Sequence, residues 1–310
     1  MKAVVTLGEV MALFLAEPQV PLADAVRFHR HVAGSEGNVA VGLARLGHPV
    51  TLFGRVGADA PGRWVTTTLR GEGVDVSALR TDHDRPTGLL VRDAPTGRPV
   101  TVSYHRAGSA GAALRPADVD AALVRAAGML FVTALTAALS PDARAAVEKA
   151  VDIAHAHGVP VVLDPNVRLR LAPAPVWRDL VTQLVPRADT VLAGEEELHD
   201  IGLDADWLRA AAPRLVVIKE GVRGARVTDG ARWRHAPARA VAAVDPVGAG
   251  DAFAAGWISA TLRGRSPEQS LTYANTVASC VVAAHGDLPG LPDPATVERL
   301  LADPTSTVNR

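Results

Sequence analysis

Short apolar runs alternate with longer amphipathic segments along the chain from about residue 110 onward. The apolar runs lie at 128–132, 159–163, 190–193 and 215–219, and polar or glycine-bearing residues follow each of them. Runs of this length indicate buried strands, and the segments between them have the spacing of helices. Strands that alternate with helices are typical of βαβ units, so the pattern predicts an α/β fold with a mainly parallel sheet. Ligands of such sheets bind at the carboxyl ends of the strands.

One helix has both of its ends marked in the sequence. Ser140 can cap its first turn, and Pro141 is suited to the first helical position because proline has no N–H to satisfy there. Gly158 is the residue type that most often ends a helix. The sequence therefore predicts a helix that begins at residue 141 and ends just before residue 158.

Residues 87–92 and 100–105 break the alternation of strands and helices. In the second run every second residue is apolar, as in a half-buried antiparallel strand, and turn-forming residues at 94–99 separate the two runs. We expect a hairpin that joins the early segment 11–32 in a small sheet, which stands off the main body as a lid or a dimer contact. The alternative is a plain edge hairpin, which would still need a packing partner to be stable.

The composition points to a small-molecule partner. The 310 residues have a formal net charge of −1, with 32 Lys and Arg against 33 Asp and Glu. This balance argues against a nucleic-acid-binding surface and against a basic membrane anchor. The apolar uncharged run at 126–141 is too short to cross a bilayer. We therefore expect a cytoplasmic protein that binds neither nucleic acid nor membrane.

The run DPVGAGDAF at 245–253 carries the strongest chemical signal. Gly248, Ala249 and Gly250 are small enough for the backbone to approach a ligand, and they precede an apolar helix whose first N–H groups have no partner within the helix. The positive end of the helix dipole lies at the same place, so the turn can bind a phosphoryl group. Asp251 is then placed to accept a proton from an incoming hydroxyl, although the dipole favours its ionised form and makes it a weak base.

This turn has two other interpretations. Gly-x-Gly followed by an acid also occurs at ordinary helix starts, where Asp251 would serve as an N-terminal cap. A dinucleotide-binding turn needs a third glycine, but Phe253 stands at that position and the run lies far from the first strand. A Walker-type phosphate loop is excluded because the chain contains no Gly-Lys-Ser/Thr.

Together with AGSEGNVAVGLARLG at 33–47 and GRVGADAPGR at 54–63, this turn makes the chain resemble the ribokinase-like sugar kinases, the PfkB family, nearly from end to end. The resemblance implies a three-layer α/β/α domain over 1–310, with a central mostly parallel sheet and a β lid from about 10–33 and 86–107. It also implies that residues 248–251 form the anion hole, that Asp251 is the catalytic base, and that Gly34 and Asn38 hold the sugar.

Further motifs resemble one branch of that family, the 2-keto-3-deoxygluconate kinases. They are GEVMALF near the N-terminus, SYHRAGSA at 103–110, LDPNVR at 163–168 and HGDLPGLP at 285–292. The resemblance implies that Tyr104, Arg106 and Arg168 contact an acid sugar. Chemistry supports the two arginines independently, because a guanidinium binds a carboxylate with two charge-assisted hydrogen bonds. Each arginine alone would more readily be a surface or salt-bridge residue.

The chain also departs from the family pattern. Residues 11–15 are apolar where kinases of neutral sugars tend to carry an acid, and Leu90 stands where keto-deoxygluconate kinases often have a tyrosine. Gly194 replaces the asparagine of the family's Asn-x-x-Glu motif, which leaves Glu197 to order Mg²⁺ through water. These departures leave the exact sugar open.

On the nucleotide side, the resemblance implies that Lys219, Gly221 and Gly224 contact phosphate and ribose and that Asn275 lines the adenine side. The implied cofactors are ATP and Mg²⁺, a K⁺ requirement is left open, and the lid implies a homodimer. Other acceptors considered are fructose, another keto-sugar acid and a nucleoside. Outside the kinases, the alternatives are a nucleotide-binding regulator without turnover and a dinucleotide-dependent oxidoreductase.

Overall fold

A mostly parallel sheet forms the centre of the computed structural model, which describes residues 3–95, 99–211 and 213–303. Within these residues the strands of this main sheet run in the order β13-β12-β11-β10-β9-β8-β1-β4-β5. Two of its pairs are antiparallel, β11 with β12 and β12 with β13. The strands are β1 (Val4–Leu7), β4 (Val50–Gly57), β5 (Leu79–Asp82), β8 (Met129–Thr133), β9 (Val161–Asp164), β10 (Thr190–Gly194), β11 (Leu215–Lys219), β12 (Ala225–Thr228) and β13 (Arg234–Ala236).

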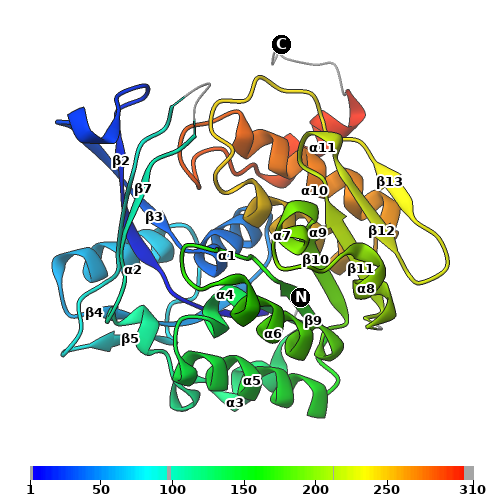
Figure 1. Ribbon diagram of the computed structural model, residues 1–310, viewed down its shortest axis with the longest axis horizontal. Coiled ribbons are helices and arrows are strands. Elements are labelled where there is room, and N and C mark those ends of the chain that lie inside the picture. Colours follow the sequence, from blue (N-terminus) through cyan, green and yellow to red (C-terminus); the bar gives the residue numbers. More distant parts are fainter. Residues whose placement is uncertain (1–2, 96–98, 212, 304–310) are drawn as a thin grey trace.

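Helices cover both faces of the main sheet (Figure 1). Neighbouring strand residues point to opposite faces, so that Val4 packs in one core and Val5 in the other. Burial on both faces explains why the strands read as continuous apolar runs. One layer contains α1 (Ser35–Arg45), α2 (Ala60–Gly71), α9 (Ala249–Leu262), α10 (Pro267–Val282) and α11 (Pro294–Ala302), and the other contains α3 (Ala121–Ala126), α4 (Ala134–Ala137), α5 (Pro141–Ala156), α6 (Ala174–Leu184), α7 (Glu195–Asp200) and α8 (Ala205–Ala210).

The predicted elements are confirmed. The predicted helix is α5, and the Ser140 hydroxyl accepts a hydrogen bond from the N–H of Ala143 at 3.1 Å. The four predicted strands are β8, β9, β10 and β11, with ends that differ by at most two residues. Among the helices of the described residues, none has the length and apolar character that a membrane span requires.

The predicted small sheet is also present, with the strand order β3-β2-β6-β7. Its strands are β2 (Met11–Ala16), β3 (Phe28–Ala33), β6 (Leu89–Arg92) and β7 (Val102–His105). The early segment and the hairpin therefore meet, through a parallel pair between β2 and β6. Residues 96–98 of the expected turn lie outside the described residues. Met11, Leu13, Leu15 and Leu90 belong to a core of its own within this sheet.

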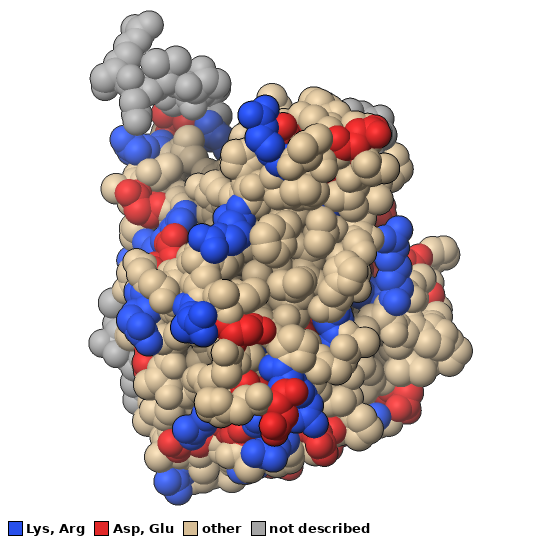
Figure 2. Space-filling view, turned by 90° about the vertical axis from the view of Figure 1, so that its left-hand side faces the viewer, with Lys and Arg blue, Asp and Glu red and all other residues tan. Residues whose placement is uncertain are grey.

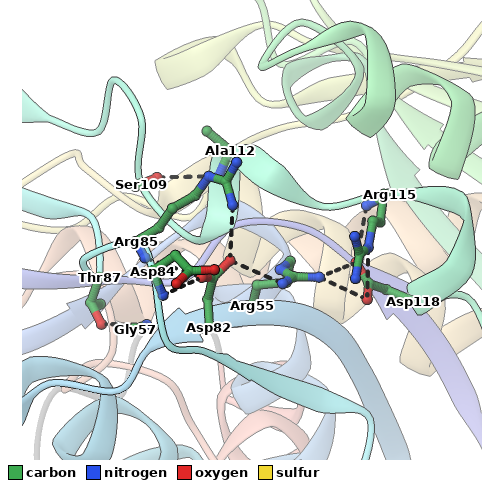
Figure 3. Close-up of polar contacts among 10 residues, drawn as sticks. All are labelled: Arg55, Gly57, Asp82, Asp84, Arg85, Thr87, Ser109, Ala112, Arg115 and Asp118. Atoms are coloured by element: carbon green, nitrogen blue, oxygen red, sulfur yellow. Dashed lines mark hydrogen bonds and ion pairs between the residues drawn. The ribbon is translucent and has the colours of Figure 1, made fainter.

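Arg55 forms hydrogen bonds with both of the chain segments that connect the two sheets (Figure 3). The chain leaves β5 at Asp82 for β6, and it returns after β7 through a turn that ends at Asp118. Arg55, on β4, donates hydrogen bonds to Asp82 at 2.9 Å and to both carboxylate oxygens of Asp118 at 3.0 Å. Both carboxylates are buried, so the outgoing and the returning segments are fixed to the same strand.

Candidate active site

A cavity of about 770 Å³ lies between the small sheet and the carboxyl ends of the main strands. Glu9 follows β1, Asn166 follows β9, and Lys219 ends β11, so the main sheet supplies polar groups where parallel strands end. The other side is lined by the small sheet, whose contributing residues are Met11, Ala33, Leu90, Arg92, Val102 and Tyr104.

Asp251 lies in the first turn of α9 and lines this cavity. Ser35 Oγ donates to its Oδ1 at 2.6 Å, and Asn38 Nδ2 donates to its Oδ2 at 2.8 Å. Both donors come from the same face of α1, because residues three apart are neighbours on a helix. Asn166, which follows β9, donates a hydrogen bond to Ser35 Oγ at 2.7 Å and so fixes the position of that hydroxyl. The carboxylate is therefore fixed in orientation by side chains from separate elements.

The pKa of Asp251 differs from the sequence-based expectation of a weak base. Burial raises the pKa of Asp251 above its ordinary value, although the hydrogen bonds from Ser35 and Asn38 and the charge of Arg168 act in the opposite direction. The expectation of a weak base considered only the helix dipole, whereas desolvation of the carboxylate has the larger effect here. Asp251 is a stronger base than an exposed aspartate.

The start of α9 has the form that anion binding needs. Gly248 is the N-cap residue, with a left-handed φ of 87° that favours glycine, and no side chain caps the helix. The alternative that Asp251 is the cap is therefore wrong. A Cβ atom built on Gly250 would lie 3.6 Å from Nζ of Lys219, so that cation lies beside the turn. The N–H of Ala249 donates to the carbonyl oxygen of Pro246 at 3.3 Å, whereas the next first-turn amides have no partner within the helix. These amides and the neighbouring ammonium group attract the same ligand, an anion.

Lys219 is held in place by Asp164. Its Nζ lies 2.7 Å from Asp164 Oδ2, and both side chains are largely buried. Burial alone would lower the pKa of Lys219, but Asp164, Glu197 and Asp251 raise it, and the net shift is upward. The lysine therefore stays protonated at the cavity wall, rather than solvated as a strand-end lysine usually is.

Of the other predicted nucleotide contacts, Gly221, Gly224 and Asn275, only Gly221 lines the cavity. A Cβ atom on Gly224 would lie 2.2 Å from the carbonyl oxygen of Ala236, so close packing against the β13 end requires this glycine. Asn275 is buried, and its amide donates to the carbonyl oxygens of Ala236 and Pro237 at 2.9 and 3.1 Å. The cavity lining therefore gives no support to a nucleotide contact by Asn275.

The predicted sugar contacts all line the cavity, namely Gly34, Asn38, Tyr104, Arg106 and Arg168. Arg106 forms a 2.5 Å ion pair with Glu9, whose other oxygen accepts a 2.5 Å hydrogen bond from Ser109. The side chain of Arg168 is 48% exposed, and it lies 3.6 Å from Glu197. Arg168 also donates to the carbonyl oxygen of Val167 at 2.9 Å, and its guanidinium is more open to a ligand than that of Arg106, which is held in a fixed position.

Glu197 is the best candidate for a metal contact among the described residues. It lines the cavity near Arg168, and its Oε2 atom is buried without a hydrogen-bond partner. No group of three or more His, Cys, Asp or Glu side chains suited to a metal occurs in the described part of the chain. A single carboxylate such as Glu197 fits Mg²⁺, because this ion keeps several waters and is usually bound by one or two carboxylates together with substrate phosphates.

Several residues of the site were missed from the sequence. Glu9 lines the cavity just after the first strand, but it was not predicted as a site residue. Only the apolar residues that follow it were used in the prediction. Ser35 lies within the quoted glycine-asparagine motif, so its position gave a signal that was not used. Arg92, Asp245 and Asp287 form a buried ion pair group beside the glycine turn, and no spacing in the sequence indicates that these three side chains meet.

Comparison with known proteins gives carbohydrate kinases by family and by individual relatives. Residues 1–294 match the model of the pfkB family carbohydrate kinases. The chain is 34% identical to the 2-dehydro-3-deoxygluconokinase of Thermoproteus tenax, over 97% of this chain and 94% of that protein. It is also 34% identical to the enzyme of that name from Bacillus subtilis (strain 168), over 93% and 92%. A crystal structure of a putative ribokinase II from E. coli has the same fold, with a TM-score of 0.90 at 22% identity over 97% of this chain and 99% of that one.

Proposed function

Because this chain belongs to the pfkB family of carbohydrate kinases, we propose that it transfers the γ-phosphoryl group of ATP to 2-keto-3-deoxygluconate, giving the 6-phosphate. 2-Dehydro-3-deoxygluconate, after which both of the relatives described above are named, is the same compound. The observation that carries the proposal is that Arg106 and Arg168 line the same cavity as Asp251. A substrate held there would meet both a carboxylate-binding pair and a base.

An acid sugar suits two of the cations that line the cavity, Arg106 and Arg168. Arg168 has an exposed guanidinium whose nearest acidic partner, Glu197, lies 3.6 Å away, so it can form charge-assisted bonds with a substrate carboxylate. Arg106 is fixed by Glu9 and can add a second cation without losing rotamer freedom on binding. Fructose, ribose and nucleosides have no carboxylate and would leave this pair unused.

In the proposed reaction, the residues around Asp251 position and deprotonate the acceptor hydroxyl. Ser35 and Asn38 orient the Asp251 carboxylate, which accepts the hydroxyl proton as the phosphorus–oxygen bond forms. The amides of 248–251 and Lys219 stabilise the charge on the transferring group. The transition state of phosphoryl transfer is loose, so positioning and electrostatics supply most of the rate enhancement.

Mg·ATP fits the remaining part of the cavity. Lys219 and Gly221 line it next to the glycine turn, and Glu197 would hold Mg²⁺ through a water molecule. The metal would neutralise phosphate charge when bound. Because Mg·ATP is an intracellular phosphoryl donor, a cytoplasmic location follows from this proposal.

The small sheet is proposed to act as the lid of a single kinase domain and as the contact of a homodimer. It supplies one wall of the cavity, so its position decides whether solvent reaches the sugar. Figure 2 looks onto the side of the molecule where the small sheet lies, and its charged side chains gather along the lower edge and margins around a mainly uncharged region. A second copy of the chain would cover such a region without burying many charges.

The product identifies the reaction. The purified protein is incubated with Mg·ATP and 2-keto-3-deoxygluconate, and ³¹P NMR follows ATP, ADP and sugar phosphate. We expect a new phosphomonoester in equal amount to ADP, formed about 10²–10⁴-fold more slowly by Asp251→Asn. ADP with inorganic phosphate but no sugar phosphate would refute the proposal, as would an Asp251→Asn protein with unchanged rate.

A further inference from the structure

Arg92 is a buried cation that reaches from the small sheet to the glycine turn. It is the last residue of β6 and is only 1% exposed. One of its terminal nitrogens, Nη2, lies 2.8 Å from Asp245 Oδ2 and 2.9 Å from Asp287 Oδ1. Its other terminal nitrogen donates to the carbonyl oxygen of Asp93 at 3.2 Å. A single guanidinium thus joins two carboxylates that are distant from it in the sequence.

Asp245 and Asp287 both contact the glycine turn, Asp245 through its carboxylate and Asp287 through its backbone. Asp245 begins the turn, and its oxygens accept hydrogen bonds from the N–H groups of Val247 and Gly286, both at 3.1 Å. A Cβ atom on Gly248 would lie 3.1 Å from the Cα atom of Asp287, so the backbone at Asp287 packs directly against the turn. The contacts of Arg92 therefore fix the turn from both of its sides.

The contacts continue from Asp287 to the proposed catalytic base. Asn38 Nδ2 lies 3.3 Å from Asp287 Oδ2 and 2.8 Å from Asp251 Oδ2. The same amide group therefore bridges the carboxylate that Arg92 holds and the carboxylate that accepts the substrate proton. A shift of Asp287 would move Asn38 and change the orientation of Asp251.

Charge gives Arg92 a second effect on the site. Asp245, Asp251 and Asp287 gather where the negatively charged phosphoryl group would bind, and Arg92 neutralises two of them. Removing one member of a buried ion pair leaves an uncompensated charge, which is far costlier than losing an exposed pair. Without Arg92, the glycine turn would have to move or the carboxylates would have to take up protons.

We propose that Arg92 is a positioning residue that couples the small sheet to phosphoryl transfer: the glycine turn reaches its active geometry only when β6 is seated and its guanidinium holds Asp245 and Asp287. The proposal rests on the phosphoryl transfer proposed above. It assigns to the small sheet a role in assembling the catalytic centre, in addition to covering the sugar.

The test compares Arg92→Lys and Arg92→Met with the wild-type protein. Lysine keeps the charge but has one ammonium group in place of the planar fork of donors, whereas methionine keeps an unbranched apolar side chain and removes both the charge and the donors. Arg30→Ala is the matched control, because Arg30 lies on β3 of the same sheet and contacts the ring of Trp64 instead of the cavity. Steady-state kinetics and hydrogen exchange of segment 245–253 are measured for each full-length protein.

We expect kcat to fall about 10²-fold in Arg92→Met and about tenfold in Arg92→Lys, with smaller changes in KM, because a misplaced reacting group mainly affects the transition state. Exchange in segment 245–253 should be faster in both variants and unchanged in Arg30→Ala. A merely structural residue would lower the folded fraction and leave kcat per folded molecule unchanged.

The pH profile gives an independent readout. With Arg92 gone, the unneutralised charge of Asp287 raises the pKa of Asp251 further, so the acid limb of kcat should move to higher pH in Arg92→Met and stay in place in Arg92→Lys. The groups that face Asp251 in both cases are Glu36 on α1, Asp164 on β9, Lys219 on β11, and Arg168 and Asp287 on loops.

The outcomes separate the two proposals. If Arg92→Lys keeps kcat within twofold of the wild type and leaves exchange in 245–253 unchanged, Arg92 does not position the turn, whether or not Arg92→Met folds. If the wild-type protein phosphorylates no sugar while exchange in 245–253 still rises in Arg92→Lys, the proposed substrate is wrong and the coupling stands.

Discussion

Asp251 is subject to opposing effects on its ionisation. Burial raises its pKa, while Ser35, Asn38 and Arg168 lower it, and the net shift is upward from an ordinary value of about 3.9. The base is active only when ionised, so activity is lost as pH falls through the raised pKa. We therefore predict an acid limb of kcat/KM above the pH of an ordinary aspartate. A limb that persists unchanged in Ser35→Ala would contradict this assignment, because losing that hydrogen bond should move it upward.

Glu36 makes a separate prediction about stability. It is buried in the first turn of α1, where the hydroxyls of Thr133 and Thr136 donate to Oε1 at 2.6 and 2.5 Å. Burial raises its pKa to about 7 from 4.5 despite these bonds. The folded state therefore binds this proton more tightly than the unfolded state, and the resulting stability is complete below the unfolded pKa and lost as pH rises through about 7.

Replacing this carboxyl with an amide should remove the pH dependence. Glu36→Gln should gain stability relative to the wild-type protein between pH 5 and pH 8, by up to about 3 kcal/mol. Urea unfolding at both pH values measures the difference. Parallel pH profiles for the two proteins would show that Glu36 does not titrate in this range.

The site residues that could be predicted from the sequence are those that lie in contiguous motifs. Asp251, Asn38 and Lys219 lie at the cavity because each sits at a helix start or strand end that the local pattern identifies. Arg92 could not be predicted, because its partners are 153 and 195 positions away and meet it only through the fold. The Asn275 amide instead holds backbone carbonyls, which a helical pattern does not reveal.

Among the elements, the connections of the small sheet carry the most specific prediction. Arg55 is 11% exposed and bridges Asp82 and Asp118, which are buried (Figure 3). Arg55→Met leaves both carboxylates without this partner, so we expect a loss of about 3–5 kcal/mol in the free energy of unfolding. Arg144→Ala removes a half-exposed pair with Glu148 on α5 and should cost less than about 1 kcal/mol. Equal losses in chemical denaturation would contradict the burial argument.

Strands and helices were predictable where burial dictates a continuous apolar run. The strands β8 to β11 are covered by helices on both faces and were found with ends off by at most two residues. The strands β12 and β13 at one end of the sheet were not predicted, because they are short and half-buried arginines, Arg226 and Arg234, interrupt their apolar pattern. The parallel pairing of β2 with β6 also depends on contacts between segments that are far apart in the sequence.

For the whole molecule, the proposed homodimer predicts the mass of the protein in solution. Val26, two residues before β3, and Phe28, the first residue of β3, are 91% and 39% exposed. If a second copy covers them, light scattering of the purified protein should give a mass near twice 32.3 kDa, and Phe28→Glu should shift it towards 32.3 kDa. A wild-type protein that stays at 32.3 kDa at tens of micromolar would refute the dimer.

The proposed kinase recognises an acid sugar in a cavity that both sheets line. The direct test is kcat/KM for 2-keto-3-deoxygluconate against fructose, ribose and adenosine, in the wild-type protein and in Arg168→Gln. We predict that the wild-type protein prefers the keto-deoxy acid, and that Arg168→Gln lowers kcat/KM for this substrate about 10–100-fold, the value of a charged hydrogen bond, with little effect on the others. Preference for a neutral acceptor, or a preference for the acid that Arg168→Gln leaves intact, would contradict the account.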